Sequence, residues 1–143
     1  MGYHVVPAEE HAWVDRPSEG PAPRRTADIT VTAALGESRA RLWHLPPHTR
    51  GRRHKELVQE EVFVVLEGRL TMLLGEPPER VDLDPQSVVS VEPGTGIQLR
   101  NESGEDVVVF AYGAPPISAR PSTWTTSSSS AGRRQPARSR RSS

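Results

Sequence analysis

The sequence has no cysteine, so disulfide bonds and thiolate metal sites are excluded. No stretch approaches the roughly 20 apolar residues that a membrane-spanning helix needs. The first fifteen residues lack a basic start followed by an apolar run, so they do not resemble a secretory signal. These absences predict a soluble, cytoplasmic protein that does not insert into a membrane.

Several catalytic motifs are also missing. The sequence has no glycine-rich phosphate loop, no GxSxG elbow and no HExxH pair. The length of 143 residues indicates one domain. The net charge of zero conceals an uneven distribution, because residues 1–120 hold 13 basic and 18 acidic groups, a net charge of −5. An acidic body argues against binding to nucleic acid, which requires a positive face.

Composition divides the chain into three parts. Residues 1–26 are predicted to form an N-terminal arm and loop, with proline and glycine concentrated in residues 15–26. Residues 27–120 form the predicted body. Residues 121–143 are rich in serine and arginine and nearly free of apolar residues, which predicts a disordered tail.

Within the body, short segments rich in β-branched residues alternate with turn residues, and none shows a sustained helical period. Seven or eight such strands predict an all-β sandwich or barrel of short antiparallel strands. The segments are 29–33, 38–44, 61–67, 69–74, 80–83, 87–91, 97–100 and 106–112.

Polar residues follow a specific spacing before and at the start of the predicted strand 61–67. His54-Lys55-Glu56 is followed, after four residues, by Glu61 and, after six more, by Gly68. A second pattern lies farther along the chain. There the turn Pro93-Gly94 precedes Ile97, and Asn101 follows Ile97 after three residues.

The two patterns together resemble the paired motifs of the cupin family. The first cupin motif runs from a glycine through His-x-His to a glutamate and a second glycine. This chain departs from it at two positions, with His48 at the leading glycine and Glu56 at the second histidine. In the second motif, Gln86 replaces the leading glycine and Ile97 replaces the histidine. The resemblance implies a jelly-roll β-barrel, often a homodimer, with a pocket in the barrel mouth.

The resemblance also implies a metal site at His54, Glu56 and Glu61. Strand residues two apart point the same way, so His54 and Glu56 would face the barrel interior together. One imidazole and two carboxylates could hold one divalent ion, Mn, Fe, Ni or Zn. Alternatively, His54 is a surface residue of the basic run 50–55, and Glu56 pairs with a nearby arginine at the rim.

Candidate catalytic and ligand-binding residues follow from the same strands. Glu61 shares a face with Phe63, and an inward carboxylate against apolar walls would have a raised pKa unless a cation meets it. Glu61 and His54 are therefore the candidate general acid or base. Ile97 and Leu99 share a face that would make the pocket floor apolar, and a register shift of one would bring Arg100 to a ligand carboxylate.

Three functions remain open on the sequence alone. The first is a metal-dependent oxygenase, isomerase or decarboxylase with a degenerate site, or a metal-free version that uses Glu61 or His54. The second is a ligand-binding or sensor protein without metal. The third is an interaction protein that acts through its basic tail.

Overall fold

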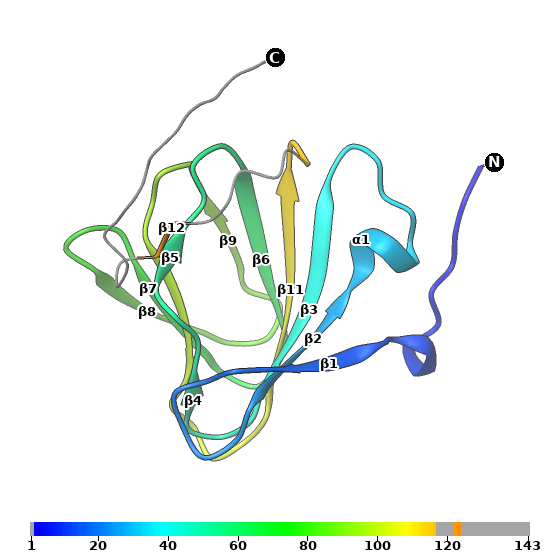
Figure 1. The fold of residues 1–143 in the computed structure, drawn as a ribbon. Helices are drawn as coiled ribbons and strands as arrows, with labels where there is room; N and C mark the ends of the chain where they lie inside the picture. Colours follow the sequence, from blue (N-terminus) through cyan, green and yellow to red (C-terminus); the bar gives the residue numbers. More distant parts are fainter. Residues whose placement is uncertain (1, 117–121, 124–143) are drawn as a thin grey trace.

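The computed structural model describes residues 2–116 and 122–123. They form two antiparallel β-sheets that face each other (Figure 1). The predicted all-β jelly-roll barrel is confirmed. Within the described residues, no helix combines the length and hydropathy needed to span a bilayer.

The first sheet has the strand order β1-β2-β3-β11-β6-β9, and the second has the order β12-β5-β10-β7-β8, with β4 also paired to β10. Strands far apart in sequence are therefore neighbours, as β3 and β11 are. The bounds are β1 Trp13–Arg16, β2 Arg24–Asp28, β3 Arg39–Leu45, β4 Thr49–Arg50, β5 His54–Lys55, β6 Glu60–Glu67, β7 Leu70–Leu74, β8 Glu79–Leu83, β9 Val88–Val91, β10 Ile97–Asn101, β11 Val107–Ala114 and β12 Ser122–Thr123.

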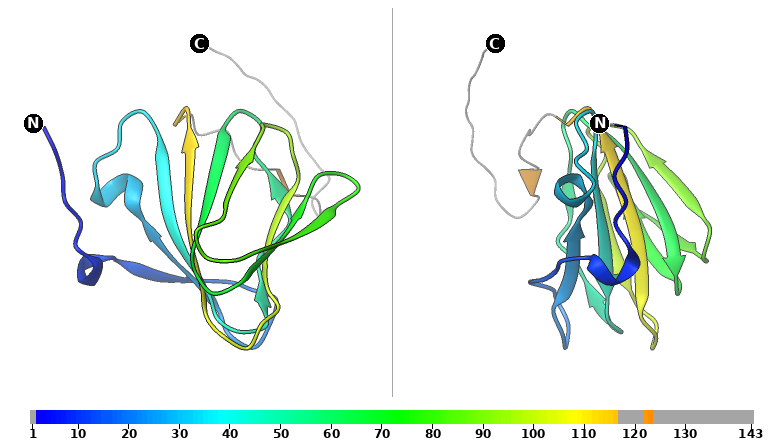
Figure 2. Two further views of the ribbon diagram at one scale, coloured as in Figure 1. Left: turned by 180° about the vertical axis from the view of Figure 1, so that it is seen from behind. Right: turned by 90° about the vertical axis from the view of Figure 1, so that its right-hand side faces the viewer.

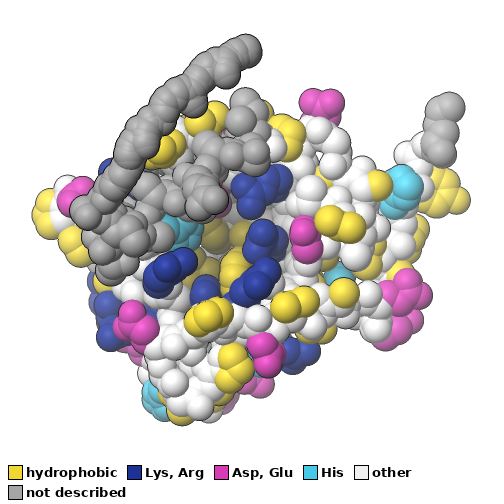
Figure 3. Space-filling view, in the orientation of Figure 1, with side chains coloured by type: hydrophobic (Ala, Val, Ile, Leu, Met, Phe, Trp, Pro, Cys, Tyr) yellow, Lys and Arg dark blue, Asp and Glu magenta, His cyan; other side chains and the backbone are white. Residues whose placement is uncertain are grey.

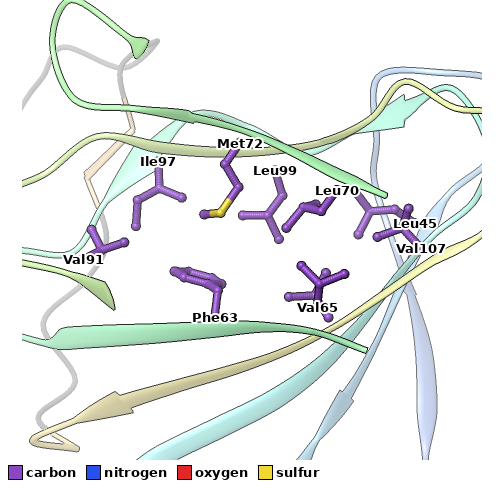
Figure 4. Close-up of a cluster of buried hydrophobic side chains, with 10 residues drawn as sticks. Leu45, Phe63, Val65, Leu70, Met72, Val91, Ile97, Leu99 and Val107 are labelled. Atoms are coloured by element: carbon purple, nitrogen blue, oxygen red, sulfur yellow. The ribbon is translucent and has the colours of Figure 1, made fainter. Parts of the chain in front are cut away.

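The hydrophobic core fills the space between the two sheets. Figure 4 shows Phe63 and Val65 on one side facing Met72 and Leu99 on the other. These residues alternate along their strands with outward-facing ones, as the pleat of a strand requires. The buried cluster comprises Leu45, Phe63, Val65, Leu70, Met72, Val91, Ile97, Leu99, Val107 and Val109.

The N-terminal part of the fold differs from the sequence prediction. The segment expected to be a strand at 29–33 contains a short helix, α1 (Ile29–Thr32), and a single-turn 3-10 helix, η1 (Ala8–Glu10), occurs earlier in the chain. The Asp28 side chain caps α1 by accepting a hydrogen bond from the Thr30 backbone N–H at 3.0 Å. The prediction of a strand was wrong because this capping interaction outweighs the β-preference of branched residues. Figure 2 shows α1 and η1 at the same edge of the first sheet, where β1 and β2 pair.

Most of the predicted disordered tail, residues 121–143, lies outside the described residues. Ser122–Thr123 is the exception, and this pair of residues forms β12 against His54–Lys55 of β5. The tail's backbone thus meets the strand that carries the first histidine of the motif.

Gly68, the last residue of the first motif, is required by backbone geometry. Its φ is 76°, and a Cβ there would overlap the Asp106 carbonyl oxygen and lie 3.1 Å from the Val107 Cα. We expect Gly68→Ala to lower the free energy of unfolding by about 2 kcal/mol, because both strain and backbone overlap oppose it. Chemical denaturation measures this loss.

The matched control is Gly104→Ala. No heavy atom lies within 4 Å of a Cβ at that position, and its φ is not in the left-handed region. We expect a change below about 0.5 kcal/mol. Equal losses for the two variants would show that Gly68 is not under this constraint.

Candidate functional site

A cavity of about 200 Å³ opens between the two sheets and is lined by residues from both. His54 from β5, Glu56 from the following loop and Glu61 from β6 all line it. The structure therefore brings together the three residues that the sequence singled out. Figure 3 shows basic side chains gathered around a hollow with hydrophobic side chains at its base.

The wall of this pocket changes from charged to apolar along each strand. On β3, the alternate residues Arg39, Arg41 and Trp43 line the cavity in that order, and the last inward residue, Leu45, is fully buried. On β6, Glu61 is followed by Phe63 and then by buried core. The mouth of the barrel is thus polar, whereas its floor is the top of the hydrophobic core.

Glu61 is partly buried at the charged end of this wall. Its strand neighbours in register are Gly113 of β11 and Val91 of β9. Burial, reinforced by the nearby Glu56 carboxylate, raises the pKa of Glu61 to about 7, while Arg39 acts in the opposite direction. Glu61 Oε1 is buried and accepts no hydrogen bond from any described residue. The site therefore holds a carboxyl group with a free oxygen and a proton that it can release near neutral pH.

Gly113 explains how Arg39 and Glu61 influence each other. In the strand register, Arg39 pairs with Gly113, and Gly113 pairs with Glu61. The two charged side chains are therefore separated by one strand that carries no side chain at that level. The Gln59 side chain lies over this position, because a Cβ at Gly113 would be 3.3 Å from its Oε1.

Glu56 joins the two sequence motifs. Its side chain is 7% exposed, and its Oε1 has no hydrogen-bond partner among the described residues. Its backbone carbonyl accepts a hydrogen bond of 2.7 Å from the Gly94 N–H. The turn at Pro93-Gly94 therefore holds the loop that places Glu56 in the pocket, contrary to the alternative of an exposed glutamate at the rim.

His54 is partly buried beside Glu56. Burial lowers its pKa, although the Arg52 carbonyl and the Glu56 carboxylate act in the opposite direction. Its Nδ1 lies 3.4 Å from the Arg52 carbonyl oxygen. Burial favours the neutral ring, and this contact favours the proton on Nδ1, which leaves Nε2 as an acceptor.

The remaining predicted ligand-binding residues divide into two groups. Phe63 and Leu99 line the cavity, whereas Ile97 lies in the core at 0% exposure. Arg100 is on the other face of β10, where its side chain bonds Gln98 and Glu102. The register shift that would bring Arg100 to the pocket does not occur.

Sequence reasoning missed the pocket's arginines and Gln59. Arg39 donates to Gln59 Oε1 at 3.3 Å, and Gln59 Nε2 donates to the Pro115 carbonyl at 2.8 Å. The signal in the sequence was the two-residue spacing of Arg39, Arg41 and Leu45, which places their side chains on one face of the strand. That alternation suggested a solvent-facing polar side, because charged residues rarely line the interior of a barrel.

The donor set does not fit a divalent metal ion. The pocket offers one imidazole and two carboxylates, and Ile97 contributes only hydrocarbon where the cupin pattern has a histidine. No group of three or more His, Cys, Asp or Glu within the described part of the chain is arranged to hold a metal. Arginine side chains line the same cavity and would repel a cation. We therefore derive no chemistry through a metal.

The fold and the pocket together define a class of protein, namely small antiparallel jelly-roll barrels that are open at one end. Residues 41–112 match the family described as the cupin domain. The chain belongs to the cupin family. No curated protein matches it.

Solved structures share this fold at low sequence identity. The polyketide cyclase RemF from Streptomyces resistomycificus is 13% identical with a TM-score of 0.70, over 86% of each chain. KdgF from Halomonas sp. is 17% identical with a TM-score of 0.65, over 78% of this chain and 94% of that one. A predicted oxalate decarboxylase from Thermotoga maritima is 16% identical with a TM-score of 0.66, over 78% and 98%. At such identities these likenesses show the fold and not the reaction.

Proposed function

We propose that this cupin binds a small, partly apolar organic molecule in the mouth of its barrel. The observation that carries the proposal is the cavity itself, which joins an apolar floor to buried polar atoms without partners. Phe63, Leu99 and Trp43 supply the floor and wall, and Glu56 and Glu61 each present one unpartnered oxygen. Buried polar atoms of this kind are costly unless a ligand or water satisfies them.

The size of the cavity limits the ligand. At about 200 Å³ it is smaller than the pockets of roughly 300–1,000 Å³ that hold drug-sized molecules. A single ring or a short chain with one or two polar groups fits this space. Larger ligands would have to project from the mouth.

A metal-free enzyme is the second candidate, and Glu61 favours it. A carboxyl group beside Phe63, with a buried oxygen that has no hydrogen-bond partner among the described residues, is positioned to give or take a proton from a bound molecule. The fold's relatives include proteins named as a cyclase and a decarboxylase, so the barrel accommodates more than one chemistry. Conversion of a bound compound that stops in Glu61→Gln would support this candidate.

The metal-dependent oxygenase or isomerase predicted from the sequence requires donors that the pocket does not arrange. Metal analysis after incubation with Mn, Fe, Ni and Zn distinguishes the metal-dependent enzyme from the metal-free one. Stoichiometric metal that is lost in His54→Ala would favour the metal-dependent enzyme. Substoichiometric metal would favour the metal-free pocket.

Filling the cavity tests the binding proposal. Ala111 lies on β11 between Arg41 and Phe63 in register and lines the pocket. At a hundredfold excess over Kd, a bound compound stabilises the folded state by about 2.7 kcal/mol, which raises the Tm by several degrees. We expect at least one of phenylacetate, hexanoate, benzamide and indole to do so, and Ala111→Leu to abolish the shift by occupying the space.

Ala12→Leu is the matched control, because Ala12 is exposed and lies outside the pocket. The same gain in side-chain volume there should leave the shift unchanged. Stabilisation that persists in Ala111→Leu would place the ligand elsewhere and refute the pocket as the binding site.

Two expectations about partners stay predictions. The homodimer would cover apolar side chains on the outer face of the first sheet, where Val88 is 62% exposed and Tyr112 40% exposed. The absence of nucleic-acid binding by the body rests on its acidic charge.

A further inference from the structure

Four arginines outside the pocket have a carboxylate partner. Arg50 pairs with Glu19 at 2.9 Å, and Arg69 pairs with Asp84 at 3.4 Å. Arg80 and Arg100 share Glu102, at 2.7 and 3.1 Å. These four arginines are therefore paired with acids on the surface of the protein.

The arginines of the pocket differ from these four. Arg24, Arg39, Arg41 and Arg52 all line it, and none of the four makes an ion pair with any described residue. Glu56 and Glu61 line the same cavity, yet each keeps a buried oxygen that accepts no hydrogen bond from the part of the chain that the structure describes. The arginines thus bring more positive charge into the pocket than the two carboxylates can offset.

Two of these arginines are held in place by neutral groups. Arg24 Nε donates to the Pro17 carbonyl at 2.9 Å, and its guanidinium stacks 4.7 Å from the centre of the Trp43 ring. Gly51 makes room for it, because a Cβ there would lie 2.6 Å from Arg24 Nη1. Arg39 is held by the amide of Gln59. Such partners fix the position of a guanidinium without neutralising its charge.

We propose that these arginines form the recognition site for the carboxylate of a small organic acid whose apolar body rests on Trp43 and Phe63. This inference rests on the proposed function and names its ligand class. A planar guanidinium matches a carboxylate through two parallel hydrogen bonds. The arginines occupy the pocket that would receive a cation in a barrel with the full histidine set, so the charge preference of the site is reversed.

A monocarboxylate fits better than a phosphate. The pocket also contains Glu56 and Glu61, which repel each further negative charge on a ligand. Phosphate sites commonly present several backbone N–H groups at a helix start or turn, whereas most residues of the cavity wall here lie on strands.

Matched acids and amides test the charge preference on the full chain. Calorimetry would compare phenylacetate with phenylacetamide, hexanoate with hexanamide, and both acids with acetate. We expect each acid to bind at least tenfold more tightly than its amide and than acetate. We also expect the affinity of the acids, but not of the amides, to fall as NaCl is raised.

Variants of the pocket arginines test whether the preference for acids over amides arises in the pocket. Arg41→Gln should weaken phenylacetate binding at least tenfold and leave phenylacetamide unchanged. Arg52→Gln is the second variant, since Arg52 is exposed and its loss does not threaten the fold. Arg69→Gln makes the same change at a surface ion pair and should have no effect.

The outcomes separate this inference from the proposal on which it rests. Equal affinity for acids and amides, with both lost in Ala111→Leu, would refute the carboxylate site and leave the binding pocket standing. No binding by any acid or amide would refute both. Tenfold tighter binding of phenyl phosphate than of phenylacetate would overturn the assignment to a carboxylate.

Discussion

Replacing Asn101 by aspartate is expected to lower the free energy of unfolding by about 3 kcal/mol or more. The side chain is 1% exposed, and its Nδ2 donates to the carbonyls of Leu45 at 2.9 Å and Pro46 at 3.1 Å and also to that of Glu105. Its Oδ1 accepts from the backbone and the hydroxyl of Ser103. Aspartate keeps the shape but turns a donor into a buried negative charge that faces carbonyl oxygens. Chemical denaturation at pH 7 measures the loss.

Gln98→Glu is the matched control, since it makes the same amide-to-carboxylate change on the same strand. Gln98 is also buried, but it donates only to the Gly51 carbonyl and already accepts from Arg100 at 2.9 Å. A charge there gains a cation as partner, so we expect a loss of about 1 kcal/mol. If the two variants lost similar amounts, the network around Asn101 would not be the reason for its presence.

Asn101 and Ile97 show what the second motif retains. Asn101 ties the turn after β3 to the turn before β11 and is needed by any barrel with these connections. Ile97, four residues earlier, packs in the core where a metal-binding barrel would present an imidazole. The second motif of this chain thus has the asparagine that supports the fold and lacks the histidine that would bind a metal.

The fold could be predicted because its determinants are local or follow a fixed spacing. Strand alternation, the glycine at position 68 and the Pro93-Gly94 turn each specify a backbone feature that the structure contains. The helix at Ile29–Thr32 was missed because a four-residue element depends on one capping side chain rather than on periodicity.

The candidate site could be predicted only in part. His54, Glu56 and Glu61 were found because the motif spacing singles them out. The arginines were not, because their meeting depends on which face of β3 turns inward and on the pairing of β3 with β11. Neither is encoded in neighbouring residues. In a barrel, the polar face of a strand can be the inner face near the open end, which reverses the usual interpretation of alternation.

Glu61 is expected to make the protein less stable as the pH rises. Its pKa is raised from 4.5 to about 7 in the folded chain, mainly by burial and then by Glu56. Between these two values the folded chain binds more protons than the unfolded chain, so stability falls across that window and levels off above it. The expected loss from pH 5 to pH 8 is about 2 to 3 kcal/mol. Arg39 acts against this rise in the pKa of Glu61. The pKa of His54 is lowered from 6.5 in the folded chain, so the contribution of His54 to stability rises with pH below 6.5.

Glu61→Gln isolates this contribution, because His54 and the arginines are present in both proteins. Glutamine mimics the protonated acid, so the variant should match the wild type near pH 5 and exceed it by about 2 to 3 kcal/mol at pH 8. Denaturation curves across this range give the difference.

The control is Glu60→Gln, which makes the same change at an exposed neighbour and should shift stability by less than about 0.5 kcal/mol at any pH. A pH-independent difference for Glu61→Gln would mean that the carboxyl is solvated rather than buried in the wall of the pocket. A gain in stability that coincides with weaker ligand binding would instead show that the fold maintains an unfavourable group in the pocket because the ligand needs it.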